Sequence, residues 1–196
     1  MKLIIVIAAV ALGLYQFMTD REVKHPPGVL VDEIPTQTEI LEKSNPLRFK
    51  DASIVKLAEY KIRARVLGKE RYWLGQKAKL MPYDVAVGWK ELSNSAIIDK
   101  LHISQADRFY FYRWENSSNL NPDTIRVSSA NMHLIASNAD IEKKISRLRA
   151  GNIITLEGQL VAVSFKDGSE IKSSLSRDDS GPGACEVMWV TSISGL

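Results

Sequence analysis

Residues 60–66 read YKIRARV, and in this stretch apolar and basic side chains alternate one by one. A period of two places successive side chains on opposite faces of a β-strand. One face of the strand is therefore expected to pack on a core, and the other, with Lys61, Arg63 and Arg65, to face water. The stretch predicts that the fold is built on a sheet.

Further strands follow along the chain. Residues 153–165, IITLEGQLVAVSF, form a long apolar run that predicts a strand bent at Gly158. The tripeptide at 166–168, Lys-Asp-Gly, is a hairpin signal. Residues 109–114, FYFYRW, carry aromatic side chains on both faces, which predicts a place near the middle of a sheet. Other strands are expected at 85–89, 128–135, 169–175 and 184–193.

Two short helices are expected between these strands. The first begins at Ser93 or Ser95, and the second at Ser137 or Asn138, because these side chains cap helix amino termini. Apolar residues in the second helix recur at i, i+4 and i+7, which makes one stripe. Strands with two inserted helices predict an α+β fold with a mostly antiparallel, curved sheet, and a small barrel is an alternative form of that sheet.

The amino-terminal segment is apolar from Leu3 to Met18 apart from one glutamine. Sixteen residues make roughly 24 Å of helix, somewhat less than a bilayer's hydrocarbon core of about 30 Å. Ala11 and Gly13 have the spacing of a signal cleavage site but lie inside the apolar run. We therefore predict an uncleaved signal anchor, a transmembrane helix, over residues 1–19. A cleaved signal peptide and a buried cytosolic helix are the alternatives.

Domain organisation and location follow from this anchor. Residues 20–50 contain four prolines and predict a semi-rigid linker and arm, and residues 51–196 predict one globular α+β domain. Lys2 favours an inside amino terminus. The expected location is the bacterial inner membrane, with a single pass and the globular domain in the periplasm.

Composition excludes several classes of protein. The chain has 196 residues, 45% of them hydrophobic and 25% charged, which fits a globular domain rather than a disordered chain. A single cysteine excludes an internal disulfide framework and a multi-cysteine metal site, and no cofactor motif is present, so we expect no cofactor. A formal net charge of +3 and an exported domain argue against nucleic acid as a partner.

The densest polar cluster lies at residues 173–183, SSLSRDDSGPG. One interpretation is a loop held by its own side chains. A second is an anion site formed by Ser176 and Arg177. A third, weaker interpretation is a hard-cation site at Asp178 and Asp179.

His133 is the candidate general base, because imidazole titrates near neutrality. On a strand it shares a face with Asn131, and the opposite face is apolar. A structural, hydrogen-bonded histidine is the alternative interpretation. Its possible catalytic partners are Cys185 as a nucleophile, or the hydroxyls of Ser174 and Ser176.

Two residues of the last strand complete the candidate chemistry. Cys185 shares its face with valine and tryptophan, which favours a buried small side chain over a reactive thiol. Glu186 stands among apolar neighbours, so it either pairs with an arginine or acts as an acid with a raised pKa. The predicted catalytic set is His133, Arg177 and Glu186. The predicted ligand-binding or anion-binding set is Lys61, Arg63, Arg65, Ser176 and Arg177, where a solvated basic face is the alternative.

Five stretches resemble an uncharacterised family of bacterial proteins that have a short amino-terminal hydrophobic segment and one small domain. They are HPPGVLV (25–31), LMPYDVAVGW (80–89), SQADRFYFYRW (104–114), SSANMHLI (128–135) and IKSSLSRDDSGPGACEVMWV (171–190). The resemblance implies bacterial origin and a membrane or exported location, and it implies no activity.

These observations predict a binding or accessory module anchored in the membrane. Its expected partners are the membrane itself, through the amino-terminal helix, and either a protein or anionic lipid headgroups. The alternative is a small hydrolase or lyase-like enzyme that uses His133 together with residues 176–186.

Overall fold

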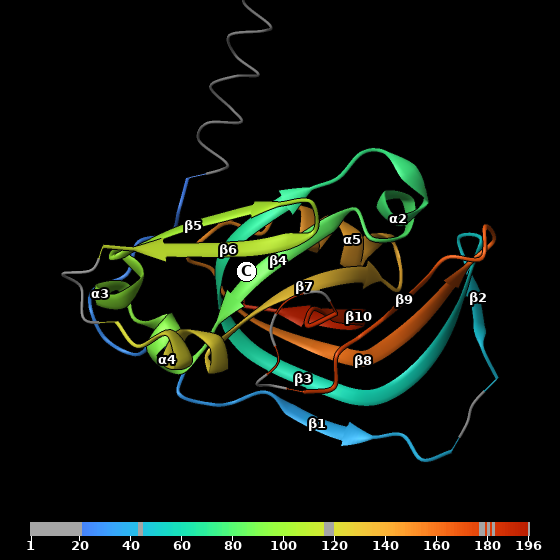
Figure 1. Cartoon of the computed structure of the whole chain (residues 1–196), viewed down its shortest axis with the longest axis horizontal. Coiled ribbons are helices and arrows are strands. Elements are labelled where there is room, and N and C mark those ends of the chain that lie inside the picture. The colour runs from blue at the N-terminus through green and yellow to red at the C-terminus, as the bar shows by residue number, and fades with distance from the viewer. Residues whose placement is uncertain are drawn as a thin grey trace, which may run out of the picture.

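The computed structural model describes residues 21–42, 45–115, 120–176, 179, 181 and 183–195. Within these residues eight strands form one curved sheet, two strands form a separate hairpin, and four short α-helices lie around them (Figure 1). The strands are β1 (Thr36–Glu39), β2 (Leu47–Phe49), β3 (Ala52–Arg71), β4 (Tyr83–Gly88), β5 (Leu101–Ala106), β6 (Phe109–Trp114), β7 (Ser129–Ala136), β8 (Ile153–Phe165), β9 (Glu170–Lys172) and β10 (Glu186–Ser194). The helices are α2 (Gly75–Leu80), the 3-10 helix η1 (Lys90–Ser93), α3 (Ser95–Ile98), α4 (Pro122–Val127) and α5 (Ala139–Ser146). The predicted α+β class with a curved, mostly antiparallel sheet is confirmed.

The sheet is organised around β3, which has 20 residues. Its first part pairs with β8 over residues 52–65, and its end pairs with β4 over residues 65–71. β4 pairs with β7, β7 runs parallel to β10, and β10 pairs with β8, so five strands are linked in a circuit. β1 and β2 pair with β3, and β9 with β8, outside this circuit. The sheet as a whole is therefore curved with open edges, and the small barrel considered from the sequence does not describe it.

The inner face of the curved sheet holds the main core. The four apolar side chains of residues 60–66 are buried there, as the alternation predicts, and Lys61 and Arg63 are exposed. Arg65 differs from the prediction, because only 2% of it is exposed. α3 covers this end of β3, and the Arg65 guanidinium donates to the hydroxyl of Ser95 at 2.7 Å.

At Gly158, β8 and β10 approach each other closely. A Cβ at this position would lie 2.0 Å from the carbonyl oxygen of Trp189. The pairing of the two strands shifts its register opposite Gly158, between Val190 and Ser192. The bend expected at Gly158 therefore coincides with an irregularity in the neighbouring strand, where only glycine fits.

Two expectations about the elements are wrong. Four α-helices are present where two were expected, because α2 and α4 have only six residues each and show no periodic apolar stripe. The strand at 109–114 is not in the middle of the large sheet. It pairs only with β5 among the described strands, in a two-stranded hairpin whose one face packs on a small outer core and whose other face is exposed.

Helix caps were partly predictable. The side chain of Asn138 accepts the backbone N–H of Ile141 at the start of α5, as expected. α3, however, is capped by Asn94, which accepts from Ala96, and not by either of the neighbouring serines. An asparagine offers the same short acceptor as serine, so the sequence alone does not separate these candidates.

The expected linker and arm lie against the domain. Val31 is fully buried in the main core, and its carbonyl accepts the backbone N–H of Lys90 at 2.7 Å. Nearer the amino terminus, the imidazole of His25 lies 2.7 Å from the carbonyl oxygen of Gly151. The predicted anchor at residues 1–19 lies outside the described residues. Among the residues that are described, no helix has the length and apolar character needed to cross a membrane.

Candidate functional site

Asp84 and His133 face each other on the outer side of the sheet. They are cross-strand partners in β4 and β7, which places their side chains on the same face. Nδ1 of His133 lies 2.9 Å from Oδ1 of Asp84, an ion-pair distance without the alignment of a hydrogen bond. Asp84 is completely buried and His133 is 4% exposed, so this charged pair is shielded from water.

Arg108 brings a second cation to the same carboxylate. Its Nη1 lies 2.7 Å from Oδ1 of Asp84 and 2.8 Å from the carbonyl oxygen of Met81. The guanidinium also stacks 3.9 Å from the ring centroid of Tyr72. Asp84 therefore joins β4, β7 and the turn between β5 and β6.

The backbone of Arg108 is held as firmly as its side chain. Its N–H donates to the hydroxyl of Tyr72 at 2.9 Å, and its carbonyl accepts from the amide of Asn131 at 3.1 Å. Asp107 and Arg108 have φ values of +51° and +70°, the conformation of a tight hairpin turn that glycine or asparagine usually occupies. An arginine in this conformation costs of order 1 kcal/mol, and its contacts with Asp84 and Tyr72 compensate for that cost.

The electrostatics of His133 reflect its neighbours. Burial alone lowers the pKa of His133, but the carboxylate of Asp84 and the adjacent thiol of Cys185 outweigh burial and raise the pKa from 6.5 to about 9. The imidazole is therefore protonated at neutral pH. The result is an imidazolium held between a buried carboxylate and a cysteine.

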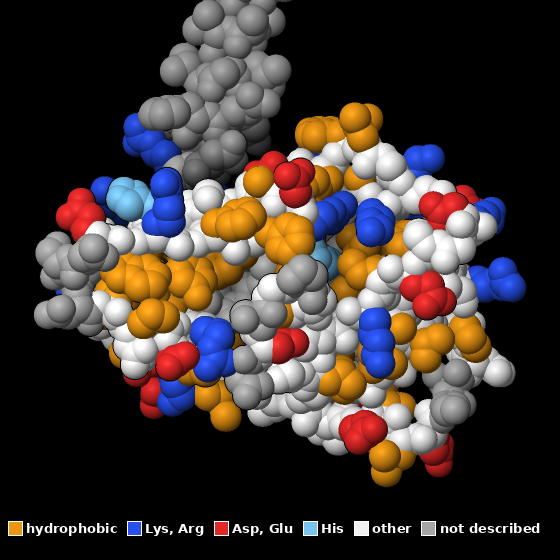
Figure 2. Space-filling view, viewed as in Figure 1, with side chains coloured by type: hydrophobic (Ala, Val, Ile, Leu, Met, Phe, Trp, Pro, Cys, Tyr) orange, Lys and Arg blue, Asp and Glu red, His pale blue; other side chains and the backbone are white. Residues whose placement is uncertain are grey.

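A pocket of about 250 Å³ lies beside this network. β6 supplies one wall with the four consecutive aromatic residues 109–112, and Asn131 and Cys185 are also part of the lining. The other lining residues are Arg126, Ser129, Ala130, Asp179, Gly181 and Ala184. Figure 2 shows hydrophobic side chains gathered along β6 on this face of the molecule. His133 does not line the pocket, and Cys185 connects the two.

Glu186 and His133 are not brought together. Glu186 is 3% exposed, and its register partner in β7 is Met132, whose side chain lies in the main core. The carboxylate is therefore on the inner face of the sheet, whereas His133 is on the outer face. The predicted Arg177 and Asp178 lie outside the described residues.

Part of the polar cluster is tied together by its own side chains. The hydroxyl of Ser174 donates to Asp179 at 2.5 Å and accepts the backbone N–H of Ser176 at 3.0 Å. Among the described residues, no three His, Cys, Asp or Glu side chains gather closely enough to hold a metal ion.

Each of the three β3 residues predicted to bind anions lies beside a carboxylate. Lys61 is 2.7 Å from Glu157, Arg63 is 3.3 Å from Glu33, and Arg65 is 3.4 Å from Glu22. The exposed pairs of Lys61 and Arg63 neutralise much of the charge that an anionic surface would meet. The anion-binding role assigned to this strand stays a prediction.

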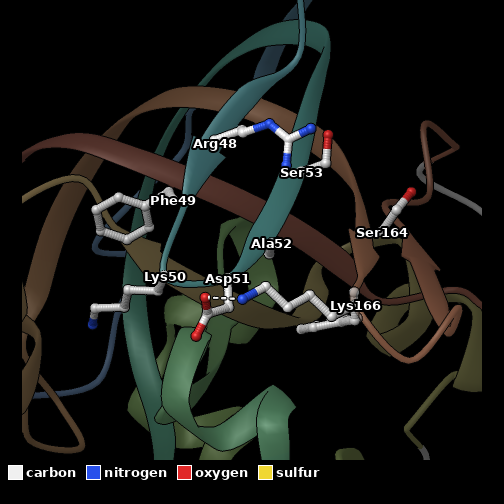
Figure 3. Close-up of a pocket in the computed structure, with 9 residues that line it drawn as sticks. Arg48, Phe49, Lys50, Asp51, Ala52, Ser53, Ser164 and Lys166 are labelled. Atoms are coloured by element: carbon white, nitrogen blue, oxygen red, sulfur yellow. Dashed lines mark hydrogen bonds and ion pairs between the residues drawn. The ribbon is translucent and has the colours of Figure 1, made fainter.

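A larger pocket, of about 450 Å³, opens at the opposite end of the sheet between the β2–β3 turn and the end of β8 (Figure 3). Figure 3 shows Asp51 and Lys166 paired across it. The hydrogen bond from Lys166 lowers the pKa of the Asp51 carboxyl. Both side chains are exposed, and the lining contains neither a histidine nor a cysteine, so this hollow offers less chemistry than the smaller one.

Asp84 and Arg108 were not among the predicted site residues. Asp84 lies two residues after Pro82 and just before the strand expected at 85–89, and the proline predicts a loop at this position. The available signal was a lone carboxylate inside the apolar run YDVAVG, the same signal that drew attention to Glu186. Arg108 carried no signal, because a charged residue in a turn is ordinary.

No family model matches the chain, and no curated protein or solved structure matches it significantly. The function must therefore be argued from the site itself.

Proposed function

We propose that the chain is a membrane-anchored bacterial protein whose exported domain is a binding module, with its ligand site in the pocket beside β6. The observation that carries this proposal is a pocket lined by the four consecutive aromatic residues 109–112 and by Asn131, whose side chain is hydrogen-bonded in place. Ligand pockets typically combine an apolar lining with a few placed polar groups, and this pocket has both.

The wall presents aromatic surface to water. Phe109 is 40% exposed and Phe111 is 49% exposed, and their ring centroids are 6.3 Å apart. Exposed aromatic rings beside a hollow favour a ligand with a flat or apolar face, because such a ligand shields the rings from water.

The side chain of Asn131, which lines the pocket, is held in place by its neighbours. Oδ1 of Asn131 accepts from Gln105 at 2.9 Å, and Nδ2 donates to the carbonyl of Arg108 at 3.1 Å. A side chain that is already held loses little entropy on binding. Arg126, on α4, adds a guanidinium to the lining, where it pairs with Asp123 at 3.2 Å. A carboxylate or phosphate group of a ligand would take the same kind of contact. The expected ligand is a small molecule with an aromatic or apolar face and an anionic group.

Ligand-observed NMR tests this function with benzoate and phenyl phosphate as probes and the full chain as receptor. Both probes should receive saturation from the protein, and the neutral benzyl alcohol should receive less. Phe111→Ala should abolish the transfer and Arg126→Gln should weaken it, whereas Val55→Ala, a change on the exposed face of β3, should leave it intact. Equal transfer with Phe111→Ala would place the ligand elsewhere and contradict the proposal.

A second candidate function is a thiol-dependent enzyme of the hydrolase or lyase-like class. The observation that favours it is that Cys185 lines the pocket while lying against His133, which Asp84 holds in turn. A cysteine beside an imidazolium is the arrangement that activates thiol nucleophiles. In this version Asp84 takes the carboxylate role that the sequence assigned to Glu186.

Alkylation by iodoacetamide tests the second candidate. Sγ of Cys185 forms a bond to the methylene carbon, iodide leaves, and the thiol proton passes to solvent. Cys185 is the only cysteine in the chain, so a single adduct reports it. An activated thiol should react faster than glutathione at pH 7, and more slowly in a folded His133→Gln variant. A rate no faster than that of glutathione would exclude the enzyme.

A further inference from the structure

The loop between β3 and α2 displays two large apolar side chains to solvent. Trp73 is 70% exposed and Leu74 is 91% exposed, and they are adjacent in the chain. Leaving a tryptophan and a leucine in water together forgoes the stabilisation that burying their apolar surface would provide. Adjacent exposed apolar side chains of this size are a feature of contact surfaces.

Trp73 and Leu74, which form the tip of this loop, are held in their exposed position. The guanidinium of Arg71 lies 3.5 Å from the ring centroid of Trp73, which is close cation–π contact. Tyr72, the residue before Trp73, is fixed by its hydroxyl contact to Arg108 and by a backbone bond to Pro82 at 2.9 Å. The apolar pair therefore projects from an ordered base.

The charges around the tip have one predominant sign. Arg71, Lys77 and Lys79 are all exposed within a few residues of Trp73. Two acids lie near this segment: Asp167 accepts from Gln76 at 3.2 Å and interacts with Lys77, and Asp51 interacts with Lys79. The tip segment itself, residues 71–80, contains no Asp or Glu. An apolar tip surrounded by cations matches the interface of an anionic bilayer, where acyl chains lie beneath negative headgroups.

The position of the tip in the molecule agrees with this match. In Figure 1 the loop that precedes α2 and the first described residues of the chain, drawn in blue, both lie along the upper edge of the domain. The apolar segment from Leu3 to Met18 precedes residue 21 directly. A chain anchored through that segment would hold this edge towards the membrane.

We infer that Trp73 and Leu74 form a second membrane contact, which inserts into the interface of an anionic bilayer while Arg71, Lys77 and Lys79 meet the headgroups. This inference rests on the membrane location that the proposed function assigns to the chain. Insertion of such side chains reaches about 5–10 Å into the boundary between headgroups and acyl chains. The contact would fix the orientation of the domain over the membrane.

Vesicles with brominated acyl chains test the inference, because bromine quenches tryptophans that enter the bilayer. The full chain is mixed with vesicles of phosphatidylcholine and phosphatidylglycerol, and emission is compared with that of a Trp73→Phe variant. The difference between the two is the signal of Trp73, and it should be quenched. Trp89 and Trp189 are buried and serve as internal references. Lys77→Gln with Lys79→Gln should reduce the quenching, and Leu41→Ser, at a distant exposed position, should not.

Sedimentation of the same vesicles separates the two proposals. A chain that sediments with the vesicles while Trp73 keeps its full emission is anchored without the tip, which overturns the inference and leaves the location standing. If the chain does not sediment with the vesicles, both the membrane contact of Trp73 and Leu74 and the proposed membrane location are overturned. Quenching of equal size in pure phosphatidylcholine vesicles would overturn the role of the three cations.

Discussion

Asp84 is the residue on which the outer network depends. Its carboxylate lies in a fully buried position between the guanidinium of Arg108 and the imidazole of His133. Replacing Asp84 with asparagine removes the negative charge and leaves two buried or half-buried cations without it. Breaking a buried pair in this way typically costs about 3–5 kcal/mol, so Asp84→Asn should lower the free energy of unfolding by that order. Urea denaturation measures the loss, and Asp123→Asn, which changes an exposed pair, is the control. Equal stability of the two variants would mean that the network contributes nothing.

The pKa of His133 makes a second prediction at this scale, on the pH dependence of stability. The pKa is raised to about 9 in the folded chain, above the unfolded value of 6.5, because Asp84 and Cys185 outweigh the effect of burial. A group of this kind stabilises the folded state fully below pH 6.5, and the contribution is lost as pH rises through 9. The melting temperature should therefore fall between about pH 6.5 and 9. His133→Gln should melt lower than the native chain at pH 6 and should lack this fall. A parallel decline in both proteins would assign it to other groups.

The sequence predicted the face of His133 but not its partner. Alternation in SSANMHLI is a local property, so the polar side of β7 could be read directly. Pairing between Asp84 and His133 depends on the register of β4 against β7, whose strands are separated by about 40 residues of chain containing a hairpin and three helices. Local patterns do not fix such a register.

At the scale of elements, the β5–β6 turn combines strain with anchoring. Asp107 and Arg108 both have positive φ values, but only Arg108 makes the contacts to Asp84 and Met81. Asp107→Gly should therefore be neutral or slightly stabilising, because glycine adopts this conformation without strain. Arg108→Gly relieves the same strain but should destabilise the fold by about 1–3 kcal/mol, since it removes the charged hydrogen bonds. Thermal melts of the two variants check the contrast. Equal effects would show that the turn is held by its backbone alone.

The elements themselves were predictable in proportion to their length. The long strand β8 and the helix α5 have clear periodicities, and both lie close to their expected positions. β6 was placed in the wrong sheet because aromatics on two faces fit a central strand and an aromatic-walled hairpin equally well. A strand in the middle of a sheet has both faces covered by other elements. In the outer hairpin only one face of β6 is covered.

At the scale of the whole molecule, the closing of the strand circuit could not be predicted from any one segment. β3 changes its hydrogen-bonding partner along its length, from β8 to β4 on the other edge, and only its 20-residue length hints at two partners. The pairing of β4 with β7, and of β7 with β10, is what places Asp84, His133 and Cys185 on one outer face. The candidate site is thus formed by tertiary structure. Sequence patterns therefore indicated His133 and Cys185 as separate candidates and did not indicate Asp84 or Arg108.

The prolines of residues 20–50 predict a linker and an arm, and residues 22–31 pack on the domain as an arm. Val31 is fully buried, and the hydroxyl of Ser93 accepts the backbone N–H groups of Leu30 and Val31 at 3.0 Å each. Glu22 lies beside the buried guanidinium of Arg65. Residues 22–31 therefore close one end of the core and do not act as a spacer.

A pair of truncations tests this role of the arm. A chain that starts at residue 20 keeps Glu22 and Val31 and should melt as the same domain. A chain that starts at residue 36 exposes the site that Val31 fills, at a cost of about 2 kcal/mol for the apolar surface alone, and it also leaves Arg65 buried without its acid. We expect its melting temperature to fall by more than that of Val31→Ala in the longer chain, because the single substitution retains Glu22. If the two truncated chains melt together, the arm is the spacer that its prolines suggest, and the buried Arg65 is satisfied by Ser93 and Ser95 alone.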